Sequence, residues 1–313
     1  MTVSARQQNK VYKPGKIKKR RIIFYSLMIA LPVVQFCIFY IGVNANSLAL
    51  AFQTFKRDSA GGGSFAFAGF ANLSALVQEL KASLTIQKAL LNSVKVWALC
   101  TAITLPFALL FSFFIYKGMP LKNLFRFSLF LPSIIPGIVT VIIYMYFAER
   151  AIPALWSSLF GKEIQGLLAN LEKQFAPLLF YNVFYSFGGY MLLFTSAMNT
   201  VDPSVREAAQ IDGVKGFREF FHIVMPKVYP TLTTFLVLSV AGIFSNQFAL
   251  YSFFGSTAQS QLITFGYYLY NATIRASYAE YPRLASMGIL LTLIVVPVTL
   301  SVKVLLERVG PKE

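Results

Sequence analysis

The chain has little of the chemistry that a catalytic or metal site requires. It contains one histidine, two cysteines and 12 acidic residues in 313. No paired carboxylates, nucleophile with a base, or Gly-x-x-x-x-Gly-Lys-Ser/Thr phosphate loop is present in the sequence. Both cysteines, Cys37 and Cys100, lie inside apolar runs, so we expect neither a disulfide framework nor a cysteine metal site. The sequence therefore predicts no enzyme, and no metal or cofactor bound by this chain.

Charged residues are also scarce. They make up 13% of the chain against 56% hydrophobic residues, and the mean hydropathy is +0.62. Ordinary soluble domains carry about 25% charge, so this composition predicts a membrane protein. The net charge of +16 could indicate nucleic-acid binding. In so apolar a chain it is more typical of basic residues flanking membrane spans, and we expect no nucleic acid partner.

Six apolar runs are long enough to cross a bilayer, which takes about 20 residues. Apart from Lys95 and Lys303 near the ends of two runs, they contain no charged residue. Their prolines are tolerated where neighbouring helices bind the freed carbonyls, which favours a packed bundle. The predicted spans are 22–41, 89–116, 127–147, 175–198, 228–254 and 284–305.

The predicted fold is an all-α membrane protein. It has a basic tail over 1–21, a six-helix transmembrane domain over 22–306 and a short tail over 307–313. The first run is about as long as a span and has no Ala-x-Ala-like cleavage site, so we interpret it as a retained helix rather than a signal peptide. The stretch FAGFANLSALVQEL in the first loop predicts an amphipathic helix lying on the membrane face.

The orientation follows from the basic residues. With the N-terminus in the cytoplasm, 18 Lys and Arg lie on the cytoplasmic side and 9 on the external side, with Lys95 unassigned. The positive-inside rule therefore favours a multi-pass protein with both termini in the cytoplasm.

The loop over 199–227 contains two helical patterns. Asp202, followed by a proline, can begin a helix as its N-cap, although Ser204 and Glu207 form a competing capping box. Gly213 provides the left-handed residue that ends this helix. A second helix follows and is expected to end at Pro226. Its predicted apolar stripe comprises Phe217, Phe220, Phe221 and Val224.

These residues resemble the EAA loop found in permeases of ATP-binding-cassette (ABC) importers. The likeness is to the carbohydrate-uptake group, and to the first permease of a two-permease pair. It extends over nearly the whole chain, with weaker matches over 69–72, 92–93 and 126–132. The sixth run departs from the family pattern, which leaves the substrate open. The matching loop residues are Glu207, Ala208, Ala209, Asp212, Gly213, Ile223 and Pro226.

The resemblance implies the type I ABC importer permease fold and a coupling helix that docks on a cytoplasmic ATPase. Ala208 and Ala209 would let the partner approach closely, Glu207 would offer a carboxylate to a partner arginine, and Gly213 would permit the sharp turn. The implied partners are a second permease forming a heterodimer, two cytoplasmic ATPase subunits that bind ATP and Mg, and an extracytoplasmic solute-binding protein. The implied location is the cytoplasmic membrane of a prokaryote. In the simpler alternative, Glu207 only caps its helix and Gly213 only ends it.

Polar residues in the middle of two spans indicate a substrate path. Burying them in lipid is costly unless they face a partner or a water-filled path. Amide and aromatic side chains suit a sugar, from a monosaccharide to an oligosaccharide or derivative, although hydrogen bonds between helices would explain them as well. The candidates are Asn182, Ser186, Tyr190, Ser239, Asn246 and Gln247.

Two other functions remain open. An ion-coupled secondary transporter usually places Asp, Glu or His within the membrane, and none occurs in the predicted spans. An ABC permease for a solute other than a sugar would have the same loop.

A cysteine placed at Lys215 tests the orientation. We expect it to react with an impermeant thiol reagent only after the membrane is opened, because the predicted loop is cytoplasmic. A cysteine at Lys162, in a loop predicted to be external, is the control and should react in intact cells. Both are placed in a chain whose two native cysteines are replaced by serine. Labelling of the Lys215 position in intact cells would overturn the topology.

Overall fold

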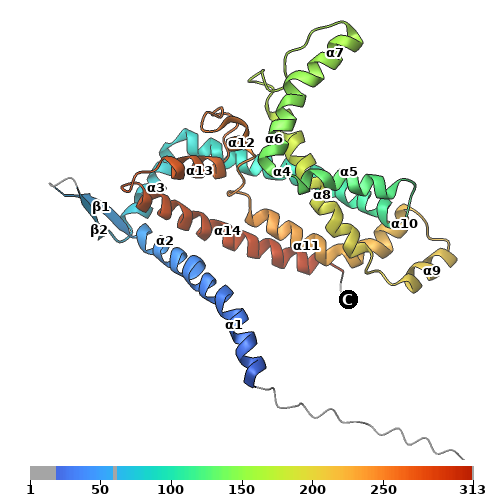
Figure 1. Cartoon of the computed structure of the whole chain (residues 1–313), viewed down its shortest axis with the longest axis horizontal. Helices are drawn as coiled ribbons and strands as arrows, with labels where there is room; N and C mark the ends of the chain where they lie inside the picture. The colour runs from blue at the N-terminus through green and yellow to red at the C-terminus, as the bar shows by residue number, and fades with distance from the viewer. Residues whose placement is uncertain (1–18, 59–61, 312–313) are drawn as a thin grey trace, which may run out of the picture. The chain divides into compact units, whose positions relative to one another are not determined.

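The computed structural model of the chain (Figure 1) describes residues 19–58 and 62–311. These residues are mostly helical and include one two-stranded sheet. The chain divides into two units, one that ends at Leu50 and one that begins at Ala51. The basic tail predicted over 1–21 lies outside the described residues apart from residues 19–21.

The first unit is a continuous helix. It consists of α1 (Lys19–Gln35), the π-helical segment η1 (Phe36–Gly42) and α2 (Val43–Ala51), whose last residue belongs to the second unit. The Phe36 and Tyr40 rings stack with their centroids 4.8 Å apart in η1. The stretch Arg21–Ala51 is long and apolar enough to cross a membrane. The first predicted span is therefore present and extends beyond residue 41.

The second unit contains five further helices of membrane-spanning length and composition. They are Leu84–Tyr116, Gly137–Phe160, Phe175–Met198, Phe217–Ala241 and Tyr281–Val309. The second, fourth and sixth spans are single helices: α4 (Leu84–Tyr116), α8 (Phe175–Met198) and α14 (Tyr281–Val309). The third consists of α6 (Gly137–Tyr146), η2 (Phe147–Ala151) and α7 (Ile152–Phe160). The fifth consists of α10 (Phe217–Glu219), η3 (Phe220–Val224) and α11 (Met225–Ala241).

The third predicted span is interrupted. Helix α5 (Lys122–Ile134) is followed by Ile135, whose backbone is extended, and α6 begins after Pro136. A proline disfavours the helical conformation of the residue before it and has no N–H of its own to donate. The single helix predicted over 127–147 is therefore wrong, because Pro136 separates two helices within it.

The fifth predicted span is also wrong at both ends. Its helix begins at Phe217 and continues through Pro226, which does not end a helix as expected. The π-helical turn η3 ends at Val224, and Pro226 lies in the first turn of α11, where the missing N–H of proline is tolerated. At the other end the helix stops at Ala241, and the rest of the predicted span contains the short helix α12 (Leu250–Phe254).

A β-hairpin that the sequence did not predict begins at Gln53. Strands β1 (Gln53–Arg57) and β2 (Gly63–Phe67) pair antiparallel with Phe55 opposite Phe65, whose ring centroids are 5.4 Å apart. The Asn72 amide donates to the Ala51 and Gln53 carbonyls at 3.0 and 2.6 Å. This amide therefore joins the hairpin to the helix that follows it, α3 (Ala71–Ala82).

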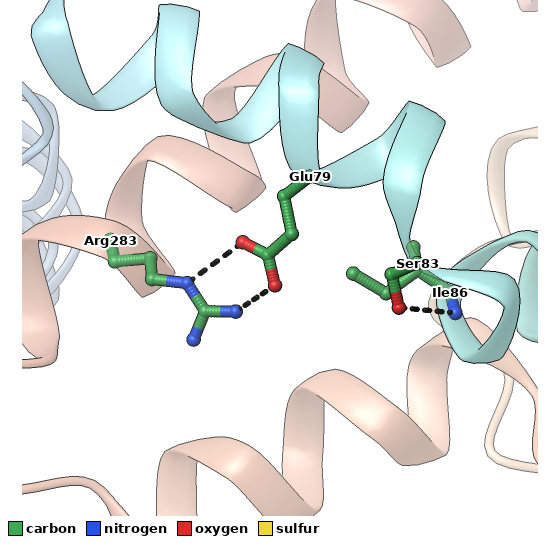
Figure 2. A network of polar contacts seen from close by, with 4 residues as sticks. All are labelled: Glu79, Ser83, Ile86 and Arg283. Carbon is green, nitrogen blue, oxygen red and sulfur yellow. Dashed lines mark hydrogen bonds and ion pairs between the residues drawn. The ribbon is translucent and has the colours of Figure 1, made fainter.

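Helix α3 is the helix predicted in the first loop, and an ion pair links it to α14. Figure 2 shows the Arg283 guanidinium facing the Glu79 carboxylate, with its Nε 3.1 Å from Glu79 Oε2. In the same view the Ser83 hydroxyl accepts the Ile86 N–H at 3.4 Å, which caps the start of α4. The pair and the cap together position the first turn of α4 beside α14.

Helix α4 packs along α8, α8 packs against α5, and α11 lies beside α14 (Figure 1). The Ser112 hydroxyl of α4 donates to the Met191 carbonyl of α8 at 2.8 Å, and Ala108 is fully buried in this interface. Where α5 crosses α8, a Cβ on Gly188 would collide with the Leu129 carbonyl oxygen and lie 2.9 Å from Phe130 Cα. Glycine therefore allows the two backbones to approach this closely.

Replacing Gly188 with alanine should separate α5 from α8. The obstacle is backbone, which cannot rotate away, so we expect a loss of about 1–3 kcal/mol of stability, measured as a lower midpoint of thermal unfolding of the purified protein. Gly189→Ala is the matched control, since a Cβ there meets nothing within 4 Å. It should leave the midpoint unchanged or raise it. Equal midpoints for the two variants would contradict the close approach.

Candidate functional site

A cavity of about 320 Å³ lies between α4, α8 and α11 and the turn that follows α11. Its wall consists of hydroxyl, amide and aromatic side chains together with small and apolar ones. No Asp, Glu, Lys or Arg is among the described residues that line it. The lining residues that the argument uses are Trp97, Thr101, Thr104, Asn182, Ser239 and Asn246.

Five of the six residues predicted for the substrate path line this cavity. Helix α8 provides three of them, the end of α11 provides one, and the following turn provides another. Gln247 is half-buried and is not among the lining residues. The five lining residues are Asn182, Ser186, Tyr190, Ser239 and Asn246.

The prediction missed the wall that α4 contributes. Trp97, Cys100, Thr101 and Thr104 line the cavity from this helix. They recur at spacings of three and four residues, so they occupy one face of the helix. The same spacing of polar side chains within an apolar span was visible in the sequence and could have identified this face.

Several of the polar groups around the cavity already bind one another. The Trp97 indole N–H donates to the Ser239 hydroxyl at 3.1 Å, which joins α4 to α11. The Asn182 amide donates to the Phe248 carbonyl at 3.3 Å, and the Asn246 side-chain oxygen accepts the Phe248 N–H at 2.8 Å. Both predicted amides therefore support the turn over 242–249 as well as lining the cavity.

This turn has an unusual backbone. Phe248 and Ala249 both have φ of 55°, in the left-handed region that costs a residue with a Cβ roughly 1–2 kcal/mol. Phe248 is fully buried, and the Thr264 hydroxyl donates to the Asn246 carbonyl at 2.8 Å. Tertiary contacts thus hold a non-helical segment in place where a helix was predicted.

Thr104 provides a buried hydroxyl that has no hydrogen-bond partner among the described residues. Thr104 is 3% exposed, and its Oγ1 makes no hydrogen bond within the described part of the chain. A buried hydroxyl without a partner is unfavourable. Thr104 belongs to the cavity wall, so this hydroxyl lies beside the space that a polar molecule would occupy.

The second predicted site is the loop over 199–227, which begins with α9 (Pro203–Ile211). Asp202 caps this helix, since its Oδ1 accepts the Ser204 N–H at 2.9 Å and the Ser204 hydroxyl at 2.8 Å. These two hydrogen bonds stabilise the ionised carboxylate and lower the pKa of Asp202. The predicted Asp202 cap is present, and it leaves the Glu207 side chain exposed.

The end of α9 is a Schellman turn. Gly213 has φ of 76°, its N–H donates to the Gln210 carbonyl at 3.1 Å, and the Val214 N–H donates to the Ala209 carbonyl at 2.9 Å. The glycine expected to stop this helix is therefore present in the expected conformation. Ala209 is only 7% exposed, which makes Ala208 the alanine of the pair that a partner can reach. Exposed loop residues of the motif are Glu207, Ala208, Asp212 and Gly213.

The second half of the motif belongs to the fifth span. Ile223 and Pro226 are half-buried in the helix that begins at Phe217. The predicted apolar stripe is only partly internal, because Phe220 and Val224 are buried whereas Phe217 and Phe221 are exposed. The loop therefore presents an exposed short helix, α9, joined by Gly213 to a helix anchored in the bundle.

Residues 101–313 match the family described as the inner membrane component of binding-protein-dependent transport systems. The chain belongs to this family. It is 26% identical over 292 residues to the arabinooligosaccharides transport system permease protein AraP of Bacillus subtilis, covering 90% of this chain and 89% of AraP. It is 27% identical over 184 residues to the probable ABC transporter permease protein MG188 homolog of Mycoplasma pneumoniae. That match covers 57% of this chain and 53% of the relative, so the chain spans about half of the relative's length.

A solved structure has the same fold. The crystal structure of a bacterial ABC transporter involved in the import of the acidic polysaccharide alginate superposes with a TM-score of 0.76. The superposition has 18% sequence identity and covers 94% of this chain and 98% of that one. The importer permease fold expected from the sequence is therefore confirmed. The family match and the six apolar helices also confirm a multi-pass membrane protein that acts as a transport subunit. Within residues 19–58 and 62–311, no group of His, Cys, Asp or Glu could hold a metal ion.

Proposed function

We propose that this chain is a permease subunit of an ATP-driven importer and that it passes a carbohydrate across the cytoplasmic membrane. The observation that carries the proposal is the cavity, whose described wall residues provide amides, hydroxyls and the Trp97 indole and include no charged side chain. Sugar hydroxyls need paired donors and acceptors, and sugar rings have apolar faces that pack on aromatic rings. The names of AraP and of the alginate transporter point to the same substrate class.

The charge of the cavity wall limits the class of solute that the cavity can bind. Alginate is an acidic polysaccharide, and an anion in a membrane cavity needs a cation or several donors nearby. None of the described residues that line the cavity is basic. We therefore expect this chain to favour a neutral sugar or oligosaccharide, with an anionic solute as the alternative.

The exposed helix α9 is the proposed docking element for an ATPase. Its Glu207 carboxylate is free to meet a partner arginine, and Ala208 allows a close approach. Closure of two ATPase subunits on ATP and Mg would then move the loop and switch the bundle between inward-facing and outward-facing states. The bundle would be completed by a second permease, and the solute would be delivered by an extracytoplasmic binding protein.

The orientation that this assembly needs agrees with the distribution of basic residues. The loop over 199–227 and both termini would face the cytoplasm, with tails over 1–21 and 307–313 and the transmembrane domain over 22–306. An ion-coupled secondary transporter is disfavoured, because none of the described residues of the cavity wall is a carboxylate or histidine that could act as a relay.

Thr104→Val tests the cavity as the sugar site. Valine has the shape of threonine without its hydroxyl, so we expect the sugar concentration that half-stimulates ATP hydrolysis to rise about tenfold, for a lost hydrogen bond of roughly 1–2 kcal/mol. The midpoint of thermal unfolding should stay the same or rise, since Thr104 Oγ1 has no partner within the described residues.

Thr299→Val is the matched control for this test. Thr299 also has a buried hydroxyl without a partner among the described residues, but it belongs to α14 and does not line the cavity. The control should leave the sugar dependence unchanged. An unchanged sugar dependence for Thr104→Val would remove α4 from the site.

Gly213→Val tests docking on the ATPase. A β-branched residue resists the left-handed conformation by about 1 kcal/mol or more, so the end of α9 should be displaced, and co-purification with the ATPase and sugar uptake should be lost. Gly161→Val is the control, because Gly161 also has positive φ (65°), ends helix α7 and has open space around it. It carries comparable strain and should keep the ATPase bound. Normal co-purification and uptake with Gly213→Val would refute docking through α9.

A further inference from the structure

A partly buried ion pair connects the loop over 199–227 to helix α4. The Lys117 ammonium lies 2.7 Å from Glu219 Oε2, and the Glu219 side chain is 1% exposed. Lys117 caps the end of α4, and Glu219 lies in the first turn of the helix that follows Gly213 and Gly216. The pair therefore joins the first turn of the fifth span to the C-terminal end of α4, the helix that lines the cavity.

The pair lies where both helix dipoles favour it. A cation is stabilised at the C-terminal end of a helix and an anion at the N-terminal end. Lys117 occupies the first kind of position on α4, and Glu219 occupies the second kind on the helix that continues as the fifth span. Each charge thus complements its own helix as well as its partner.

Packing next to the pair makes the connection stiff. The Phe113 and Phe220 rings meet edge to face with centroids 5.1 Å apart. Ile115, Phe220 and Val224 belong to one buried cluster with the interface of α4 and α8. A displacement at Glu219 is therefore passed to α4 through tight contacts rather than through a flexible segment.

The other points of contact along α4 lead to the cavity. Thr104 lies on the same helix about 20 Å from Lys117, at 1.5 Å per residue. Trp97 lies two turns further toward the start of α4 and donates to Ser239. Beyond the cavity, the Asn92 amide donates to the Gln261 carbonyl at 2.8 Å. Helix α4 thus runs as one element from the loop joint past the cavity wall to the segment before α13 (Phe265–Arg275).

We propose that the Lys117–Glu219 pair is the joint through which movement of the cytoplasmic loop reaches α4 and the cavity wall. The proposal rests on the function proposed above. Lys117 and Glu219 are positioning residues, since neither lines the cavity nor lies on α9. Removing the negative charge with Glu219→Gln should weaken the transfer of motion while α9 and its docking surface stay intact.

The test follows the cavity wall directly. A cysteine is placed at Thr101 of a chain whose two native cysteines are replaced by serine, because Cys100 also lines the cavity. The complete transporter that contains this chain is reconstituted with its ATPase subunits in lipid nanodiscs, and the rate at which N-ethylmaleimide modifies this cysteine is read by mass spectrometry. The rate is compared without nucleotide and after trapping with ATP and vanadate. With Lys117 and Glu219 both present we expect the two rates to differ. With Glu219→Gln the difference should shrink about fivefold or more, while ATP hydrolysis continues and uptake per ATP falls.

Two variants separate a joint from a merely structural contact. Glu307→Gln removes the partner of the exposed Lys303 pair, 3.8 Å apart on α14, and should leave the response unchanged. The exchanged pair Lys117→Glu with Glu219→Lys should restore part of the response that Glu219→Gln loses, because the two charges attract again although each now opposes its own helix dipole. If Glu219→Gln does not assemble, the exchanged pair alone decides, and an assembled complex without a response overturns the proposal.

The remaining outcomes are equally clear. A full response with Glu219→Gln overturns the joint and leaves the proposed function in place. If nucleotide does not change the modification rate of the Thr101 cysteine when Lys117 and Glu219 are both present, in a complex that hydrolyses ATP, the proposed function is contradicted and the joint with it.

Discussion

The contact between α4 and α8 is the constraint on which the other features depend. In a membrane, helices gain little from excluding water, so they associate through close packing and hydrogen bonds. Here the fully buried Ala108 and the hydrogen bond from Ser112 to the Met191 carbonyl provide both. Both helices line the cavity, and the same buried cluster extends to Phe220 at the start of the fifth span. Cavity and loop are thus parts of one packed structure.

The polar residues of the cavity also hold the turn at which the predicted fifth span is interrupted. A backbone that leaves the helical conformation within the membrane must find new hydrogen-bond partners. The amides of Asn182 and Asn246 and the hydroxyl of Thr264 provide them around Phe248. The polar residues that suggested a substrate path therefore have a structural task as well, and the two interpretations offered by the sequence do not exclude one another.

The sequence predicted what depends on composition and local chemistry. Charge-free runs gave six spans, and Asp202 and Gly213 gave both ends of α9, because hydropathy and capping act over a few residues. Interruptions depended on distant partners. Asn182 from another helix binds the turn that follows α11, and Asn72 joins the hairpin to α3; a local pattern contains neither contact. The wall formed by Trp97 and Thr101 differs from these cases, because its residues recur at helical spacing along α4 and depend on no distant partner for their position.

The length of α4 has a consequence for the surrounding bilayer. Its 33 residues extend about 50 Å, whereas the hydrocarbon core is about 30 Å thick and the whole bilayer about 40–45 Å. Even at the usual tilt of about 20°, α4 is longer than the lipid tails are thick, so at least one of its ends projects beyond them. A host membrane several ångströms thicker would still be spanned by this helix. The surplus length of α4 thus makes its contacts tolerant of the thickness of the host bilayer.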